Sequence, residues 1–142
     1  MIYESCNIKR EVVENDPKEK GERALLNFGH TLGHAIEKEM NFSLYHGECV
    51  VLGMIAALNI CVELGTITAN ERDDALKTFA LYEFPDHVTG INTDDVIAVS
   101  KNDKKMDAGK VKFILLKSVG DAYIDRDITD DQMRRALEGV IR

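Results

Sequence analysis

The first long helical pattern in the chain covers residues 22 to 40. Apolar side chains recur there every three or four residues, which is the spacing of one face of an α-helix. These side chains are Leu25, Phe28, Leu32, Ile36 and Met40. Asn41 follows them as a helix stop. We therefore predict a single long amphipathic helix over this segment.

A second helical segment begins near His46 and ends at Gly65. It is apolar on nearly every face, and Gly65 stands where a left-handed residue commonly ends a helix. Its longest apolar run, residues 49 to 62, is interrupted by Gly53 and Asn59 and is shorter than the roughly 20 residues that span a bilayer. The pattern predicts a buried helix in the middle of a bundle, and no membrane as a partner.

Hydroxyl residues mark the starts of two further helices. Thr68 with Glu71, and Thr129 with Gln132, match the capping box. In that motif the hydroxyl accepts a hydrogen bond from a backbone N–H, and the acidic or amide side chain reaches back to the cap. We therefore predict helices that begin after Thr68 and after Thr129.

The remaining elements are shorter. Residues 2 to 13 form an amphipathic segment, residues 15 to 22 a charged loop, and a helical stretch runs from residue 93 to near residues 103 to 105. The segments VKFILL and AYI flank residues 118 to 121 and predict a β-hairpin. The fold class is therefore mainly α, a helical bundle with one small β-hairpin. No strand precedes a glycine-rich turn, so the sequence encodes no Rossmann-type dinucleotide site, and a nucleotide would have to bind to another domain.

The composition indicates one soluble domain over residues 1 to 142. Hydrophobic residues make up 44% and charged residues 30%, as in ordinary globular proteins. Lys and Arg total 18 against 25 Asp and Glu, and no long basic cluster is present, which argues against a nucleic-acid partner. The N-terminus has no signal-peptide pattern, and Cys6, Cys49 and Cys61 show no CxxC spacing. We expect a cytoplasmic protein with reduced, buried thiols.

A polar stripe lies opposite the apolar face of the first long helix. Its residues are Arg23, Asn27, His30 and His34, spaced by 4, 3 and 4 positions. For Arg23 or Asn27 alone, an ordinary solvent-facing surface is the better explanation. Histidines at positions i and i+4, joined by His46 at the head of the next helix, instead favour a metal site, because neutral imidazoles so spaced can bind one ion. On the residues alone, His34 would be the third ligand.

Two blocks of the chain resemble a known family. The segment LLNFGHTLGHAIE followed by HGECVVLGM is similar to the paired signature of 3-dehydroquinate synthases. The similarity extends upstream to IKREVVENDPKEKGER and downstream to NDKKMDAGKVKFILLKSVGDA, so that it covers nearly the whole chain. The resemblance is to the C-terminal half of that two-domain enzyme.

The resemblance implies a carbon–oxygen lyase of the shikimate pathway, which leads to the aromatic amino acids. Such an enzyme converts 3-deoxy-D-arabino-heptulosonate 7-phosphate, a sugar acid phosphate, to 3-dehydroquinate and phosphate. Its N-terminal domain binds NAD, and its helical C-terminal domain carries a divalent metal, zinc or cobalt. The NAD domain would precede Met1 and be absent here. We therefore expect the chain to be inactive alone and to need that domain as its partner.

The resemblance also assigns roles to single residues. It makes His30 and His46 metal ligands, with a glutamate upstream of Met1 as the third ligand, and it places His34 in the proton relay. The implied catalytic set is His34, Glu19 and Lys9. The implied substrate-binding set is Lys9, Arg23, Asn27 and Lys105. Without the resemblance, ordinary surface charge explains Lys9, Glu19 and Lys105 better.

Several alternatives stay open. Related sugar-phosphate cyclases, such as 2-deoxy-scyllo-inosose synthase or valiolone-type enzymes, share this plan, although the intact GHTLGHA and the DKK at residues 103 to 105 favour dehydroquinate synthase. A polyol dehydrogenase-type metal domain is a more distant alternative. The chain could also be an inert domain or one subunit of a split enzyme. An apolar surface that normally faces the other half would favour a homodimer.

Overall fold

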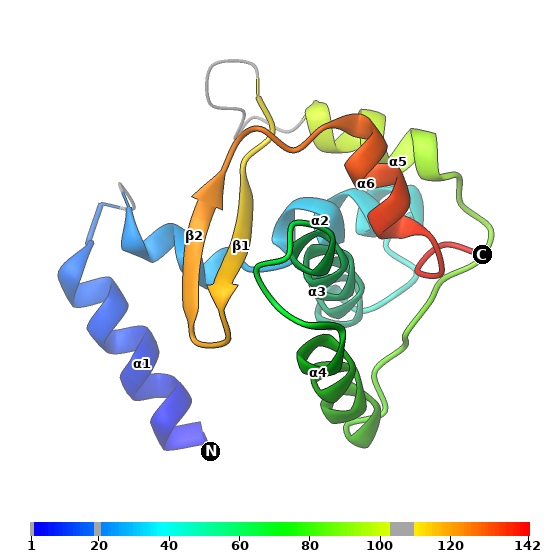
Figure 1. Ribbon diagram of the computed structural model, residues 1–142. Coiled ribbons are helices and arrows are strands. Elements are labelled where there is room, and N and C mark those ends of the chain that lie inside the picture. Colours follow the sequence, from blue (N-terminus) through cyan, green and yellow to red (C-terminus); the bar gives the residue numbers. More distant parts are fainter. Residues whose placement is uncertain (1, 19–20, 103–109) are drawn as a thin grey trace.

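The computed structural model describes residues 2–18, 21–102 and 110–142, without the side chain of Glu22. Helix α3 (His46–Glu63) lies at the centre of the domain, and the first helix stands apart from it on the far side of the β-hairpin (Figure 1). In chain order the elements are α1 (Ile2–Asn15), the 3-10 helix η1 (Glu22–Asn27), α2 (His30–Glu39), α3 (His46–Glu63), α4 (Ala69–Leu81), α5 (Thr93–Lys101), β1 (Phe113–Ser118), β2 (Asp121–Asp125) and α6 (Asp130–Leu137). The predicted fold class, a mainly helical domain with one β-hairpin, is confirmed.

Helix α3 is the core helix that its uniform apolarity predicts. Most of its side chains are buried, and α2, α4, α6 and β1 pack around it. Within the described residues it is the one helix long and apolar enough to cross a membrane, and 61% of it is buried inside the protein. Its end is also as predicted, because Gly65 follows it with a φ of 72°.

The prediction of one continuous helix over residues 22 to 40 is wrong. The segment divides into η1 and α2, separated by Phe28 in an extended conformation and Gly29 in the left-handed one, with a φ of 79°. The reason lies on the facing helix. A Cβ built on Gly53 of α3 would stand 2.0 Å from the carbonyl oxygen of Gly29 and 2.5 Å from the backbone nitrogen of Gly33. The chain turns at Gly29 so that the two main chains can touch.

The short helices begin where the sequence predicts. Thr68 accepts a hydrogen bond from the backbone of Glu71 at 3.2 Å, and the Glu71 carboxylate accepts one from the Thr68 N–H at 2.7 Å. Thr129 and Gln132 form the same reciprocal pair at the start of α6. Helix α5 starts one residue after Asn92, and its predicted end near residues 103 to 105 lies outside the described residues.

The hairpin β1–β2 is antiparallel and pairs Phe113 with Asp125. Its strand β1 packs on α3, and the backbone N–H of Leu116 donates to the Cys61 sulfur at 3.3 Å. On the other side, the Thr31 hydroxyl donates to the Lys112 carbonyl at 2.7 Å. The hairpin therefore fixes the start of α2 as well as one side of α3.

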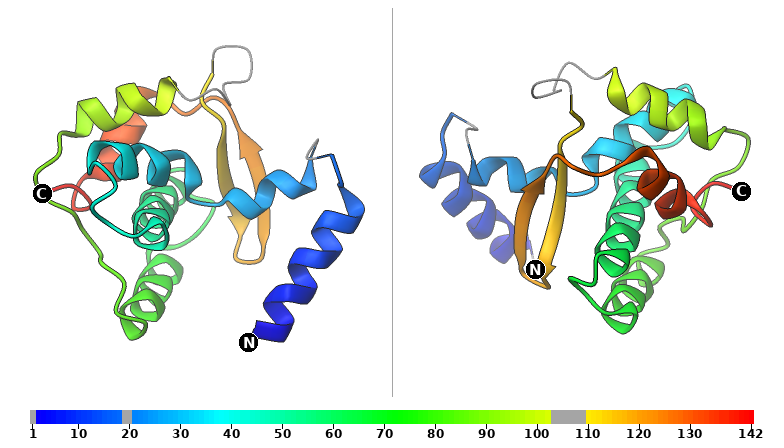
Figure 2. Two further views of the ribbon diagram at one scale, coloured as in Figure 1. Left: turned by 180° about the vertical axis from the view of Figure 1, so that it is seen from behind. Right: turned by 45° about the horizontal axis from the view of Figure 1, so that its top comes forward.

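Helix α1 stands apart from the core. It packs against η1, none of its residues is buried, and the hairpin lies between it and α3 in each view (Figure 2). Ile2, Tyr3 and Ile8 are 80%, 76% and 61% exposed. The predicted amphipathic segment is thus a helix, but the start and the middle of its apolar pattern face solvent, whereas Val12 and Val13 near its end are half-buried.

Candidate metal centre

Three imidazole rings meet where α2 faces the start of α3. His30 and His34 are one turn apart on α2, and His46 is the first residue of α3. Their ring centroids are 5.3 to 5.7 Å apart, and one nitrogen from each ring lies within 4.8 Å of the others. In a tetrahedral zinc site the ligand nitrogens are about 3.4 Å apart. Small side-chain rotations would therefore bring the three rings onto one ion.

Hydrogen bonds determine which ring nitrogen His30 and His46 can offer to a metal ion. The Nδ1 of His30 lies 3.3 Å from the Phe28 carbonyl oxygen, which can only accept, so this nitrogen carries the proton. The Nδ1 of His46 lies 3.2 Å from both carboxylate oxygens of Glu37. In the neutral form of either ring, a proton on Nδ1 leaves the Nε2 lone pair available. Neutral imidazoles of this kind fit zinc or cobalt.

Glu37 was not among the residues that the sequence pattern singled out. It follows His34 by three positions, so it continues the stripe of His30 and His34 at helical spacing. That continuation is the signal that could have identified it. An acid on a helix face is common enough that the spacing alone could not distinguish it from a solvated residue.

Cys49 lies one turn after His46 but is no candidate ligand. It is buried, and desolvation together with the charges of Glu37 and Glu48 raises the pKa of its thiol to about 11. The described residues whose ligand atoms can meet one ion are His30, His34 and His46, and Cys49 is not among them. Burial also raises the pKa of Cys61.

All three cysteines are free, but the prediction that they are buried is wrong for Cys6. Cys49 and Cys61 belong to the core on α3, whereas Cys6 is exposed. The difference follows from the position of α1, which has no buried residue.

The other predicted site residues are spread over the first part of the chain. Arg23 is at the start of η1, where its guanidinium donates to the Pro17 carbonyl at 3.1 Å. Asn27 is half-buried at the end of η1, three residues before His30. The two are therefore not on the same helix as the histidines. Lys9 is exposed on α1, and Glu19 and Lys105 lie outside the described residues.

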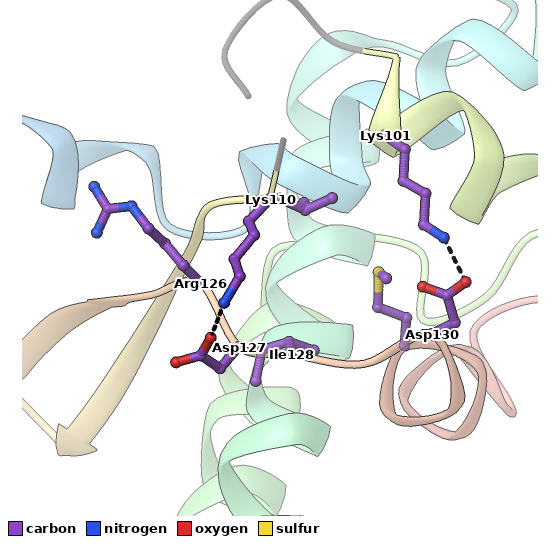
Figure 3. Close-up of a pocket in the computed structure, with 8 residues that line it drawn as sticks. Lys101, Lys110, Arg126, Asp127, Ile128 and Asp130 are labelled. Atoms are coloured by element: carbon purple, nitrogen blue, oxygen red, sulfur yellow. Dashed lines mark hydrogen bonds and ion pairs between the residues drawn. The ribbon is translucent and has the colours of Figure 1, made fainter. Parts of the chain in front are cut away.

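A separate pocket of about 350 Å³ lies between the end of α5, the approach to β1 and the start of α6. Lys110 and Lys101 point at Asp127 and Asp130 of the same pocket (Figure 3). The charges of Lys101 and Lys110 are therefore compensated by carboxylates of the pocket itself. None of its described lining residues is a predicted site residue.

Comparison with known proteins gives one family. A family model described as 3-dehydroquinate synthase C-terminal matches residues 1–106. The 3-dehydroquinate synthase of Clostridium botulinum is 44% identical over 87% of this chain, and that of Symbiobacterium thermophilum is 39% identical over all of it. The chain spans only 36% and 40% of the length of these two relatives.

A solved structure has the same fold. It is ValA, the 2-epi-5-epi-valiolone synthase of Streptomyces hygroscopicus, with NAD⁺ and Zn²⁺ bound. The TM-score is 0.80 at 25% sequence identity, and the match covers 92% of this chain and 36% of that one. The arrangement of helices and hairpin in this chain therefore also occurs in ValA.

Proposed function

Because the chain belongs to the 3-dehydroquinate synthase C-terminal family, as its sequence motifs imply, we propose that it is the metal- and substrate-binding part of a 3-dehydroquinate synthase. The full-length enzyme would be a carbon–oxygen lyase that converts 3-deoxy-D-arabino-heptulosonate 7-phosphate to 3-dehydroquinate and phosphate. The observation that carries the proposal is the convergence of His30, His34 and His46 at the contact of α2 and α3. We place this activity in the shikimate pathway and in the cytoplasm.

His30 and His46 would hold a divalent metal, zinc or cobalt, through their Nε2 atoms. The ion would supply a Lewis acid that polarises a substrate hydroxyl. NAD, bound by another domain of the full-length protein, would supply a reversible hydride acceptor. The presence of both groups in the valiolone synthase structure supports this assignment of cofactors.

His34 would then act on the substrate itself instead of binding the metal. Its ring is 5.3 Å from that of His30 and 5.4 Å from that of His46, centroid to centroid, so a hydroxyl held between those two would be within its reach. We propose that it moves the proton of that hydroxyl. The alternative, His34 as the third metal ligand in place of an upstream glutamate, predicts a different result in the titration below.

The remaining residues would position the sugar acid phosphate. Phosphate and carboxylate groups are bound well by cations and amides, which this set offers in Arg23, Asn27, Lys9 and Lys105. Glu19 would complete the catalytic set. Of these, Arg23 and Asn27 have the firmer structural support, because η1 leads directly into the histidine-bearing helix.

A valiolone-type cyclase is the second candidate, favoured by the ValA structure. The sequence comparison supports dehydroquinate synthase instead, since the relatives of that name are 38% to 46% identical, against 25% for ValA. Either enzyme would use the same histidines, and therefore the metal test applies to both.

Calorimetric titration with zinc and cobalt tests the metal centre. We expect the wild-type chain to bind, and the variants His30→Ala and His46→Ala to lose binding. His87→Ala is a matched control, because His87 lies in a loop beside Asp86. Unchanged binding in His30→Ala and His46→Ala would refute the site. In His34→Ala, retained binding supports the proton-transfer role, whereas a loss as large as in His30→Ala identifies a third ligand.

Phosphate release tests the reaction. We expect the 142-residue chain with NAD and zinc to release no phosphate from 3-deoxy-D-arabino-heptulosonate 7-phosphate, since its described residues form no dinucleotide-binding βαβ unit. A mixture with the separately produced NAD domain of a relative should release it. Release by the chain alone would contradict this expectation.

A further inference from the structure

The contact between Glu37 and His46 joins a sheltered carboxylate to an exposed imidazole. Both oxygens of Glu37 lie 3.2 Å from the His46 Nδ1. The side chain of Glu37 is 16% exposed, and that of His46 is 54% exposed. The carboxylate is therefore the fixed partner, and the imidazole is the one that it can orient.

His46 needs such a partner more than His30 does. As the first residue of α3 it has no preceding helical turn to pack against, and an exposed side chain loses rotamer entropy when it is fixed. An imidazole without a hydrogen-bond partner also exchanges between two tautomers, and only the one protonated at Nδ1 offers Nε2 to the centre. The ring of His30 is held by the main-chain carbonyl of Phe28. The ring of His46 is instead held by a side chain, that of Glu37.

The close packing of α2 on α3 fixes the distance between the two groups. A Cβ on Gly33 would stand 2.8 Å from the Cys49 carbonyl oxygen, so the helices touch one turn from both Glu37 and His46. Desolvation raises the pKa of the Cys49 thiol in the first turn of α3, and the charge of Glu37 adds to that rise. The contact of Glu37 with His46 thus lies beside the close approach of the two helices.

We propose that Glu37 is a positioning residue for the metal centre: it holds the His46 ring in the Nδ1-protonated tautomer and directs Nε2 toward His30 and His34. The inference rests on the metal-binding role proposed for His46. Glu37 itself would not touch the ion or the substrate. Partners of this kind, which accept the other N–H of a metal-bound histidine, typically contribute about 10- to 100-fold to metal affinity.

The first test needs no metal. The nitrogen-15 NMR shifts of the His46 ring, assigned with His46→Ala, report its tautomer at a pH of about 8.5, above the ordinary imidazole pKa of about 6.5. We expect the Nδ1-protonated form to dominate in the wild type and to lose population in Glu37→Ala. Glu39→Ala, a carboxylate on the same helix two residues away, should leave the spectrum unchanged. An unchanged His46 tautomer in Glu37→Ala overturns the proposal.

The second test is a cobalt titration followed by its visible spectrum. We expect Glu37→Ala to bind about 10- to 100-fold more weakly than the wild type and Glu39→Ala to bind equally. Glu37→Gln keeps the shape of the side chain and one acceptor oxygen, so its cobalt affinity should lie between those of the wild type and Glu37→Ala. If Glu37→Ala folds poorly, Glu37→Gln replaces it in this test. Equal affinity in all variants overturns the role at the metal. If the wild type binds no cobalt, the proposed function fails, while the NMR result still decides whether Glu37 orients His46.

Discussion

The contact of Gly53 with Gly29 and Gly33 makes the sharpest prediction about this fold. The change is Gly53→Ala, which adds a single methyl group at the centre of α3. That Cβ would lie 2.0 Å from the Gly29 carbonyl oxygen, whereas real Cβ contacts are essentially never under 3.0 Å. Because the opposing atoms are main chain, no side chain can rotate to make room. Helices α2 and α3 must therefore separate by about 1 Å or more.

The expected loss of stability follows from that displacement. A gap of about 0.5 to 1 Å forfeits a quarter to a half of the dispersion energy of each contact across it. Both helices contribute buried residues to the same core, among them Leu32, Ile36 and Leu52. Overpacking usually costs about 1 to 3 kcal/mol, and the main-chain clash places this variant at or above about 3 kcal/mol. This is a large part of the roughly 5 to 15 kcal/mol that holds a typical domain folded.

Urea unfolding, followed by far-UV circular dichroism, measures the effect. With a slope of about 2 kcal/mol per M, a loss of about 3 kcal/mol lowers the midpoint by about 1.5 M. Gly47→Ala is the matched control, because a Cβ on Gly47 of the same helix meets nothing within 4 Å. That control should be neutral or stabilising by up to about 1 kcal/mol, since alanine favours a helix.

Gly53→Ala should also weaken metal binding. His30 and His34 are on α2 and His46 is on α3, so separating the helices pulls the ligands apart. Zinc affinity should therefore fall in Gly53→Ala even where the variant is still folded. A wild-type midpoint and wild-type affinity in Gly53→Ala would refute the close approach of the helices. Equal destabilisation in Gly47→Ala would attribute the loss to α3 itself.

Two further predictions concern the caps and the core thiol. Removing either capping hydroxyl, in Thr68→Ala or Thr129→Ala, should lower the free energy of unfolding by about 1 kcal/mol, measured by urea unfolding. Serine at the same positions should be close to wild type, because it keeps the capping oxygen. The free energy of unfolding should fall as the pH rises toward about 11, because the unfolded chain releases the Cys49 proton before the folded one does. Cys49→Ala should show a shallower fall over the same pH range, and an identical slope would contradict the raised pKa of Cys49.

The sequence by itself determined the elements whose signals are local. The position of α3, the starts of α4 and α6 and the hairpin follow from periodicity, capping pairs and turn residues, which act over a few positions. The sequence also placed His30 and His34 side by side, because an i, i+4 pair lies on one helix face in any tertiary context. The family resemblance, which the comparisons confirm, likewise rests on contiguous motifs.

Only the tertiary structure decided where the helices touch and what that contact does. The break at Gly29 depends on Gly53, which lies 24 residues later in the chain, and no pattern within residues 22 to 40 encodes it. The contact of Glu37 with His46 depends on the reversal between α2 and α3, where Asn41 and Phe42 both have positive φ. The exposure of Cys6 depends on α1 lying outside the core. In each case the deciding contact, or its absence, involves two different elements of the fold, and helical or strand periodicity indicates which face is buried but not which other segment covers it.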